Sequence, residues 1–217
     1  MKYGILATIV LLMSIGVVSP VKAENLAQVK QLLETKQCQG CDLTGVNLKG
    51  VDLQGANLKG ANLNEANLDY ANLSQAQLQG ATLITTTLHA ANLEKVDFSG
   101  ANLSLTGMVA ANLKNANFNL ANLIGANFEG ANLLGANLTN VRQSVVGLGE
   151  VKLKNGSLYG IDVMGVNLRN ADLTSANLFG ANLMGADLTN TNFTNANLAN
   201  VDLRYTLVES NNDRFAH

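Results

Sequence analysis

The sequence predicts an all-β solenoid that begins with a short capping helix. Leu, Asn and Ala fill about 42% of the 217 positions, a bias typical of a short internal repeat. From Cys41 onward an apolar residue returns every five positions without a frame shift. This period fits neither the 3.6 residues of a helical turn nor the period of two of a flat strand. A period of five fits a chain in which each short extended segment is followed by a turn.

The first segment, residues 1–23, has the features of a secretory signal. Lys2 supplies a positive charge, a 15-residue apolar run follows, and Pro20 precedes a cleavage site that ends at Ala23. The run is shorter than the roughly 20 residues that a membrane-spanning helix needs. We expect cleavage after Ala23 and no stable membrane span afterwards. The alternative is an uncleaved anchor.

Residues 24–40 are expected to cap the solenoid and to join it. Leu26, Val29, Leu32 and Leu33 follow one another at helical spacing within residues 24–37. The end of a solenoid exposes unpaired backbone groups, which favour aggregation unless they are covered. We therefore expect an amphipathic helix over the N-terminal coil.

Residues 41–210 contain the repeat, in 34 consecutive units of five. The central position of the unit is Leu in 26 units. The residue directly before it is Asn or Asp in 25 units, and the residue two places before it is usually small and apolar. Two apolar side chains two residues apart share one face, as in a strand. Gly or Asn, frequent at the fifth place, can adopt the positive φ that a corner needs. Because one unit cannot bury its apolar pair alone, stacking of the units must create the core.

These units resemble those of pentapeptide repeat proteins. Ala56-Asn57-Leu58-Lys59-Gly60 and Ala181-Asn182-Leu183-Met184-Gly185 carry the resemblance, which covers the whole repeat region from position 41 to position 210. It implies a right-handed quadrilateral β-helix with four pentads per coil and about 8 coils. The resemblance to exported, cyanobacterial-type members implies the periplasm or the thylakoid lumen as the location.

Residues 139–156 fit the repeat least well. Gln143 takes a central apolar site and Gly156 takes the site of the small apolar residue. Either the coil continues through this stretch or a loop leaves it and returns in frame. The unbroken frame favours a continuous coil. Beyond the repeat, residues 211–217 form a polar tail without a helical pattern, so either this tail or a second copy of the chain is expected to close the C-terminal end.

Cys38 and Cys41 form a C-x-x-C motif between the predicted helix and the first coil. Haem attachment needs a histidine at the next position, which is Asp42, and the strand–helix context of a thioredoxin site is absent. In an exported protein such a pair is usually a structural disulfide. Exported pentapeptide repeat proteins resemble this chain here, with a short helix, two cysteines and then the first repeats. Free thiols are the alternative.

One outward face of the predicted solenoid carries an apolar stripe. With four pentads per coil, equivalent outward positions are occupied by Ile84, Leu105, Ile124, Val145, Met164 and Met184. Contiguous apolar patches on a surface mark interfaces more often than isolated apolar residues do. We take these six residues as a candidate interface for an unknown protein partner or for self-association.

Composition and motifs narrow the function to a binding or scaffold role. The mature chain would carry 12 basic and 16 acidic residues, and this near-neutral balance argues against a nucleic-acid-binding protein, which would need a basic stripe. The Asn and Asp residues belong to the repeat, so we expect no catalytic, metal-binding or cofactor-binding residues and no enzyme activity. The family also contains DNA mimics that bind gyrase, but the export signal and the weak acidity disfavour this alternative.

The disulfide hypothesis can be checked by counting thiols in the purified protein. We expect no reactive thiol in the denatured, unreduced chain and two after reduction, because the chain contains two cysteines. An equal count before and after reduction would contradict the disulfide.

Overall fold

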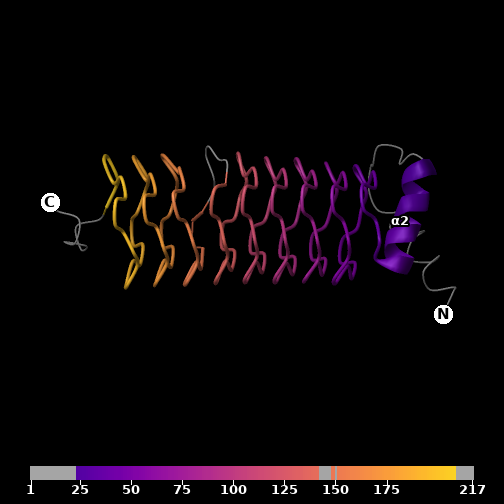
Figure 1. Ribbon diagram of the computed structural model, residues 1–217, viewed down its shortest axis with the longest axis horizontal. Helices are drawn as coiled ribbons and strands as arrows, with labels where there is room; N and C mark the ends of the chain where they lie inside the picture. Colours follow the sequence, from indigo (N-terminus) through magenta and orange to yellow (C-terminus); the bar gives the residue numbers. More distant parts are fainter. Residues whose placement is uncertain (1–22, 142–147, 150, 209–217) are drawn as a thin grey trace.

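The computed structural model describes residues 23–141, 148–149 and 151–208, which form a rod of stacked coils (Figure 1). Helix α2 (Ala23–Thr35) lies across the N-terminal end. The described residues contain no strand of regular length. Each side of a coil instead makes isolated parallel bridges to the coils beside it. The expected strand fragments are this short because the chain turns again after three extended residues.

The spacing of the bridges defines the coil. They join positions 20 apart, from Gln37 with Asn57 to Asp187 with Leu207. Four pentads therefore complete one coil, which has four sides and four corners. Equivalent residues of successive coils lie directly above one another along the rod.

Each corner is a tight turn with a positive φ at its second central residue. In the corner that follows Leu58, the N–H of Ala61 donates to the carbonyl oxygen of Leu58 at 3.1 Å, and Gly60 has a φ of 63°. This is the conformation that a type II turn requires. Non-glycine residues such as Glu65 and Leu105 adopt it too, with φ values of 61° and 59°. Because this region costs an L-residue about 1–2 kcal/mol, the stacked neighbours must hold these corners in place.

The pentad at residues 61–65 shows how the backbone N–H groups find partners. One bonds across the corner, three bond to the coils before and after, and the fifth bonds to the Asn side chain of its own unit. These bonds are Ala61 N–H to Leu58 O, Asn62 N–H to Cys41 O, Leu63 N–H to Thr82 O, Glu65 N–H to Ile84 O, and Asn64 N–H to Asn62 Oδ1. Buried backbone groups need such partners, so the Asn side chain completes the hydrogen bonding of the coil.

The interior consists of the central Leu and the small apolar side chains. Nearly all of them are completely buried, and Phe98 stacks on Phe118 at a centroid distance of 5.3 Å. Thr86, Thr106 and Thr191 take the small apolar site and are buried as well. The hydroxyl of Thr106 donates to the carbonyl oxygen of Leu83 at 2.8 Å, in the preceding coil. This bond makes a buried hydroxyl tolerable.

Asparagine side chains form ladders along the sides of the rod. The amide group of Asn92 donates to Asn72 Oδ1 at 3.0 Å, and that of Asn112 donates to Asn92 Oδ1 at 3.0 Å. Asp52 lies at the N-terminal start of this ladder and accepts from Asn72. A carboxylate has acceptors and no N–H donor, so it suits the first position, where nothing has to be donated to an earlier coil.

Helix α2 buries Val29 and Leu32 against the first coil and ends at Thr35. Lys36 follows with a φ of 59°, and its N–H donates to the carbonyl oxygen of Leu32, as in a left-handed helix cap. Gln37 is already part of the first bridge. The helix is therefore shorter at its C-terminal end than residues 24–37, and the coil geometry begins one pentad before Cys41.

The register continues across the irregular stretch. Asn132 pairs with Lys152 and Asn137 with Ser157, at the same spacing as in the rest of the rod. An extra pentad looped out between them would place Ser157 above Asn132. Residues 142–147, with Gln143, and Glu150 lie outside the described residues.

The C-terminal coil is less covered than the N-terminal one. Leu198 and Leu203 are partly buried, and Leu207 is 62% exposed. The predicted signal up to residue 22 and the tail from residue 209 lie outside the described residues. Within the described part of the chain, no helix has the length and apolar character needed to cross a membrane.

The ladder predicts opposite effects for two similar substitutions. Asn92→Asp places a carboxylate oxygen against Asn72 Oδ1 and removes a donor, so we expect a loss of about 1–2 kcal/mol in unfolding free energy. Asp52→Asn keeps the acceptor for Asn72 and should change the unfolding free energy by less than about 0.5 kcal/mol. Denaturant unfolding of both variants at pH 7 measures the difference. Equal effects would contradict the ladder as a directional element.

Candidate functional site

The candidate site is one side of the rod with the two corners that border it. We call corner A the positions 44–45 and those at 20-residue steps up to 204–205, and corner D the positions 59–60 up to 199–200. Corners B and C begin at positions 49–50 and 54–55. The DA side consists of residues 61–63 and their equivalents, between corners D and A. Positions 142–145 and 150 of these series are not described.

The predicted apolar stripe lies along corner A. The register of the bridges stacks Ile84, Leu105, Ile124, Met164 and Met184 at this corner, as the sequence predicted, while Val145 lies outside the described residues. Leu105, Ile124 and Met164 are exposed, whereas Ile84 and Met184 are half-buried. The side chain of Leu105 leans over the next coil, because a Cβ added to Gly125 would stand 2.6 Å from its Cδ2.

Corner D carries a second apolar group that the sequence reasoning missed. Leu120 and Tyr159 are exposed, and the Tyr159 ring stacks on Phe179 with centroids 5.5 Å apart. Leu120 and Ile124 flank the same side of one coil, as do Tyr159 and Met164. Counting in steps of 20 from positions 59 and 60 reaches Tyr159 and Phe179 in the first series and Leu120 in the second.

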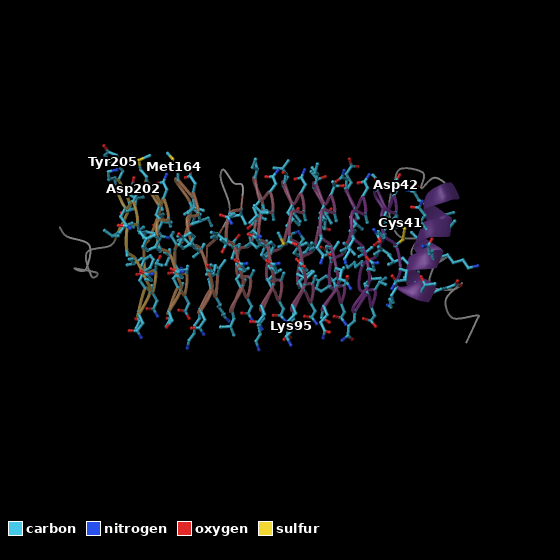
Figure 2. The ribbon with its side chains drawn as sticks, viewed as in Figure 1. Cys41, Asp42, Lys95, Met164, Asp202 and Tyr205 are labelled. Carbon is cyan, nitrogen blue, oxygen red and sulfur yellow. A yellow bond between two sulfur atoms is a disulfide. The ribbon has the colours of Figure 1, made fainter. Side chains whose placement is uncertain are left out.

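Charged residues are concentrated away from the DA side. At corners A and D the described charged residues are Lys59, Glu65 and Arg204, all near the two ends. The row along the middle of the DA side adds Asp42, Asp162 and Asp202. Corners B and C carry Lys49, Asp69, Glu94, Lys95, Lys114, Glu129, Lys154 and Arg169. Figure 2 shows Met164 and Tyr205 along one long edge of the rod and Lys95 along the opposite edge.

Two ion pairs lie in the C-terminal coils. Arg204 binds Asp202 at 2.6 Å, and Arg169 binds Asp187 at 3.3 Å. A side-chain hydrogen bond from Arg204 holds the pKa of Asp202 below its usual value, and one from Thr189 does the same for the pKa of Asp187. Both acids therefore stay ionised at neutral pH.

Asp97 is a ladder carboxylate surrounded by hydrogen-bond donors. Burial alone would raise its pKa, but hydrogen bonds from Ser99, Gln79 and Asn117 outweigh this effect and hold the pKa below the usual value. These donors all come from the coils themselves. This arrangement is that of a structural group, not of a general acid.

Cys38 and Cys41 are joined by a disulfide, with Cα atoms 5.2 Å apart. The pair spans the first corner, because Cys38 takes a central apolar site and Cys41 the next small apolar site. Both are buried, and the Gln28 side chain of α2 accepts a hydrogen bond from the N–H of Asp42 beside them. The disulfide therefore fastens the turn on which the capping helix rests.

The metal-binding side chains of the described residues are scattered along the rod. No group of three His, Cys, Asp or Glu residues among them could hold a metal ion. His89 fills the space beside Gly107, where a Cβ would stand 2.6 Å from its Cε1, and its buried Nδ1 has no hydrogen-bond partner. The imidazole replaces the side chain that the ladder lacks at this position.

The family model for pentapeptide repeats matches residues 41–76, 66–104, 108–142, 148–183 and 181–206. The chain belongs to the pentapeptide repeat family. The parallel bridges between positions 20 apart form the four-pentad coil that the resemblance of the units predicted. No curated protein sequence matches this pentapeptide repeat protein.

Three solved structures illustrate the similarity. HetL of Nostoc sp. strain PCC 7120, which is involved in heterocyst differentiation regulation, is 26% identical over 80% of this chain and 91% of its own, with a TM-score of 0.34. A trypsin-treated form of QnrB1, a plasmid-mediated fluoroquinolone resistance protein, is 18% identical over 79% of this chain and 88% of its own, with a TM-score of 0.43. A protein from the thylakoid lumen of Arabidopsis thaliana is 30% identical over 45% and 64%, with a TM-score of 0.23.

The hydrogen bonds to Asp97 predict a pH-dependent contribution to stability. Because the pKa of Asp97 is lower in the folded chain than in the unfolded chain, where an Asp has a pKa near 4, the ionised carboxylate stabilises the fold at pH values above about 4. This stabilisation is lost as the pH falls through the pKa of the folded chain. At pH 7, Asp97→Asn should lower the unfolding free energy by about 1 kcal/mol after solvent screening is allowed for. The difference from the wild type should shrink below about pH 4. A difference that stays constant from pH 7 to pH 3 would contradict this role.

Proposed function

We propose that this pentapeptide repeat protein is an exported, non-enzymatic scaffold that binds protein through its DA side. The observation that carries the proposal is the distribution of exposed large apolar side chains. Leu105, Leu120, Ile124, Tyr159, Met164 and Tyr205 are all at least 42% exposed and all lie at corners A and D. Burying such side chains contributes about 25 cal/mol per Å² of apolar area, so the DA side gains most from a protein surface.

The exposed apolar side chains elsewhere have local explanations. Leu207 and Val208 lie at the end of the last described coil. Tyr70 lies at corner B, and Lys49 Nζ is 5.2 Å from the centroid of its ring. A cation at this distance from an aromatic face is attracted to it, so Tyr70 has a partner within the rod.

The chemistry of the DA side favours protein over nucleic acid. A nucleic-acid interface needs rows of Lys and Arg for the phosphates. Between Glu65 and Asp162, the described residues of the DA side and its corners carry no charge. Aromatic residues and Met, which are enriched in the cores of protein interfaces, stand at these corners instead.

The export signal supports the location. Residues 1–23 combine a positive start, a short apolar run and a small-residue cleavage site. A buried disulfide at Cys38 and Cys41 fits a compartment in which thiols are oxidised. We therefore propose the periplasm or the thylakoid lumen as the location of the mature chain. A gyrase-binding DNA mimic would work in the cytoplasm and present a strongly acidic surface, which the mixed charges of corners B and C do not provide.

The proposal predicts a side-specific cross-link. A photo-reactive residue at Ile124, introduced in the native compartment, should give a covalent adduct with a protein. The same residue at Val109, at the matching place of corner B, should give none. Ile124→Asp should weaken the complex at least tenfold without lowering the melting temperature, because the side chain faces outward. Adducts at both sites, or at neither, would contradict binding through the DA side. Recovery of the chain in the cytoplasm with residues 1–23 attached would contradict export.

A further inference from the structure

We propose that the DA side binds a second copy of this chain, with the two rods antiparallel and face to face. This inference rests on the proposed function, because it names the partner of the same surface. The dimer has a two-fold axis in the plane between the rods and perpendicular to them. Corner A of one copy then lies against corner A of the other, and the coils run in opposite order.

The apolar residues of corner A match this symmetry. The height of a residue along the rod follows its number, since each coil uses four pentads. An axis midway between Ile84 and Met184 places these two residues opposite each other in the dimer. It also places Leu105 of one copy opposite Met164 of the other, and the exposed Ile124 close to the axis. The stripe is thus complementary to its own inverted copy, as an isologous interface requires.

Corner D fits the same axis by interdigitation. In the dimer, Tyr159 of one copy lies within about half a coil of Leu120 of the other, measured along the rod. Half a coil is roughly 2.4 Å at the usual spacing of strands. Tyr159 and Leu120 are both exposed, so each can cover the other in the second copy. Gly160 and Gly180 beside Tyr159 and Phe179 leave room for the approaching chain.

The charges at the ends of the DA side are complementary under this axis. Arg204 of one copy comes opposite Glu65 of the other, at the same corner. In the central row, Asp162 comes opposite Asn102 and Asp202 opposite Asn62, so each carboxylate meets an amide. No two described like charges face each other. A parallel arrangement would instead bring Asp162 and Asp202 against their own copies.

The buried area is sufficient for a dimer of moderate affinity. From Glu65 to Arg204 the DA side spans about seven coil steps, which at ~4.8 Å per step and a width of roughly 18 Å covers about 600 Å² per copy. The total of about 1,200 Å² is at the lower limit of stable interfaces. Helix α2 covers the N-terminal end, so rods cannot add head to tail there, and the face-to-face pair closes at two copies.

The first test measures the oligomeric state by sedimentation velocity between about 1 and 100 µM, a range that includes a micromolar dissociation constant. We expect the wild-type protein to form dimers. Arg204→Glu should raise the dissociation constant about tenfold, and adding Glu65→Arg in the same chain should restore dimerisation. Lys154→Glu at corner C is the matched control and should have no effect. A monomer over the whole range, or a dimer that ignores both substitutions at corner A, overturns the proposal.

The second test determines the register. The two native cysteines are already bonded to each other, so an introduced cysteine supplies the reactive thiol. A mixture of Leu105→Cys and Met164→Cys proteins should form a disulfide-linked heterodimer under mild oxidation, and neither variant alone should cross-link efficiently. Efficient cross-linking of Leu105→Cys with itself would place the two-fold axis beside Leu105 and overturn the proposed register.

The mass of the photo-adduct at Ile124 separates the two proposals. An adduct of twice the chain mass supports both the binding side and the second copy. An adduct with a different protein, from a chain that sediments as a monomer, overturns the dimer and leaves the proposed scaffold function standing. The absence of any adduct overturns both.

Discussion

The structure depends on one backbone constraint, a residue with positive φ after every four others. This residue closes the corner, limits each side to three extended residues and sets the coil at four sides. The register of the bridges, the stacking of Leu on Leu and the alignment of the Asn ladders all follow from that corner. Gly60 adopts it without strain, but Glu65 and Leu105 do so at a cost, so the corner is imposed by the stack as much as by local preference.

The Asn residues solve a problem that the corner creates. A turn this tight leaves one N–H per pentad pointing along the outside, without a carbonyl in reach. The side-chain oxygen of the preceding Asn accepts from it, and the amide group of that Asn donates to the Asn or Asp of the coil before. An Asp side chain accepts in the same way but has no N–H to donate to the coil before, which suits Asp52 at the start of its ladder. Asp97 likewise accepts from Asn117 of the next coil. The abundance of Asn is therefore a property of the backbone and not of a catalytic site.

Much of this could be predicted from the sequence, because a single period determines where every repeated side chain goes. The central Leu sites, the outward stripe at Ile84 to Met184 and the capping role of Val29 and Leu32 follow from that period and from helical spacing. The period does not predict the hydrogen bonds that the hydroxyl groups of Thr86, Thr106 and Thr191 donate. The acceptor of a buried Thr at an Ala site is identified only from the three-dimensional structure. The end of α2 at Thr35 also escaped prediction, because residues 34–37 contain neither glycine nor proline to mark the turn that the backbone makes at Lys36.

The candidate site shows the same limit. Corner A was found because its apolar residues stood out at 20-residue steps, while corner D was overlooked although Tyr159 and Phe179 follow the same rule. The sequence does not rank one corner above another. The exposed side chains in the structure distinguish the corners. The exposed apolar side chains of corners A and D border one side of the rod, and most of the charged side chains lie at other corners.

The covered N-terminal end has a consequence for how the rod forms. Each coil bonds only to the coils next to it, so folding can proceed as layer-by-layer growth on an existing template. Helix α2 and the Cys38–Cys41 turn provide a fixed first layer, whereas the last described coil leaves Leu207 exposed. Growth therefore has a direction that matches the order in which a ribosome delivers the chain. Fraying should begin at the opposite end, so the two ends differ in lifetime although the repeat between them is nearly uniform.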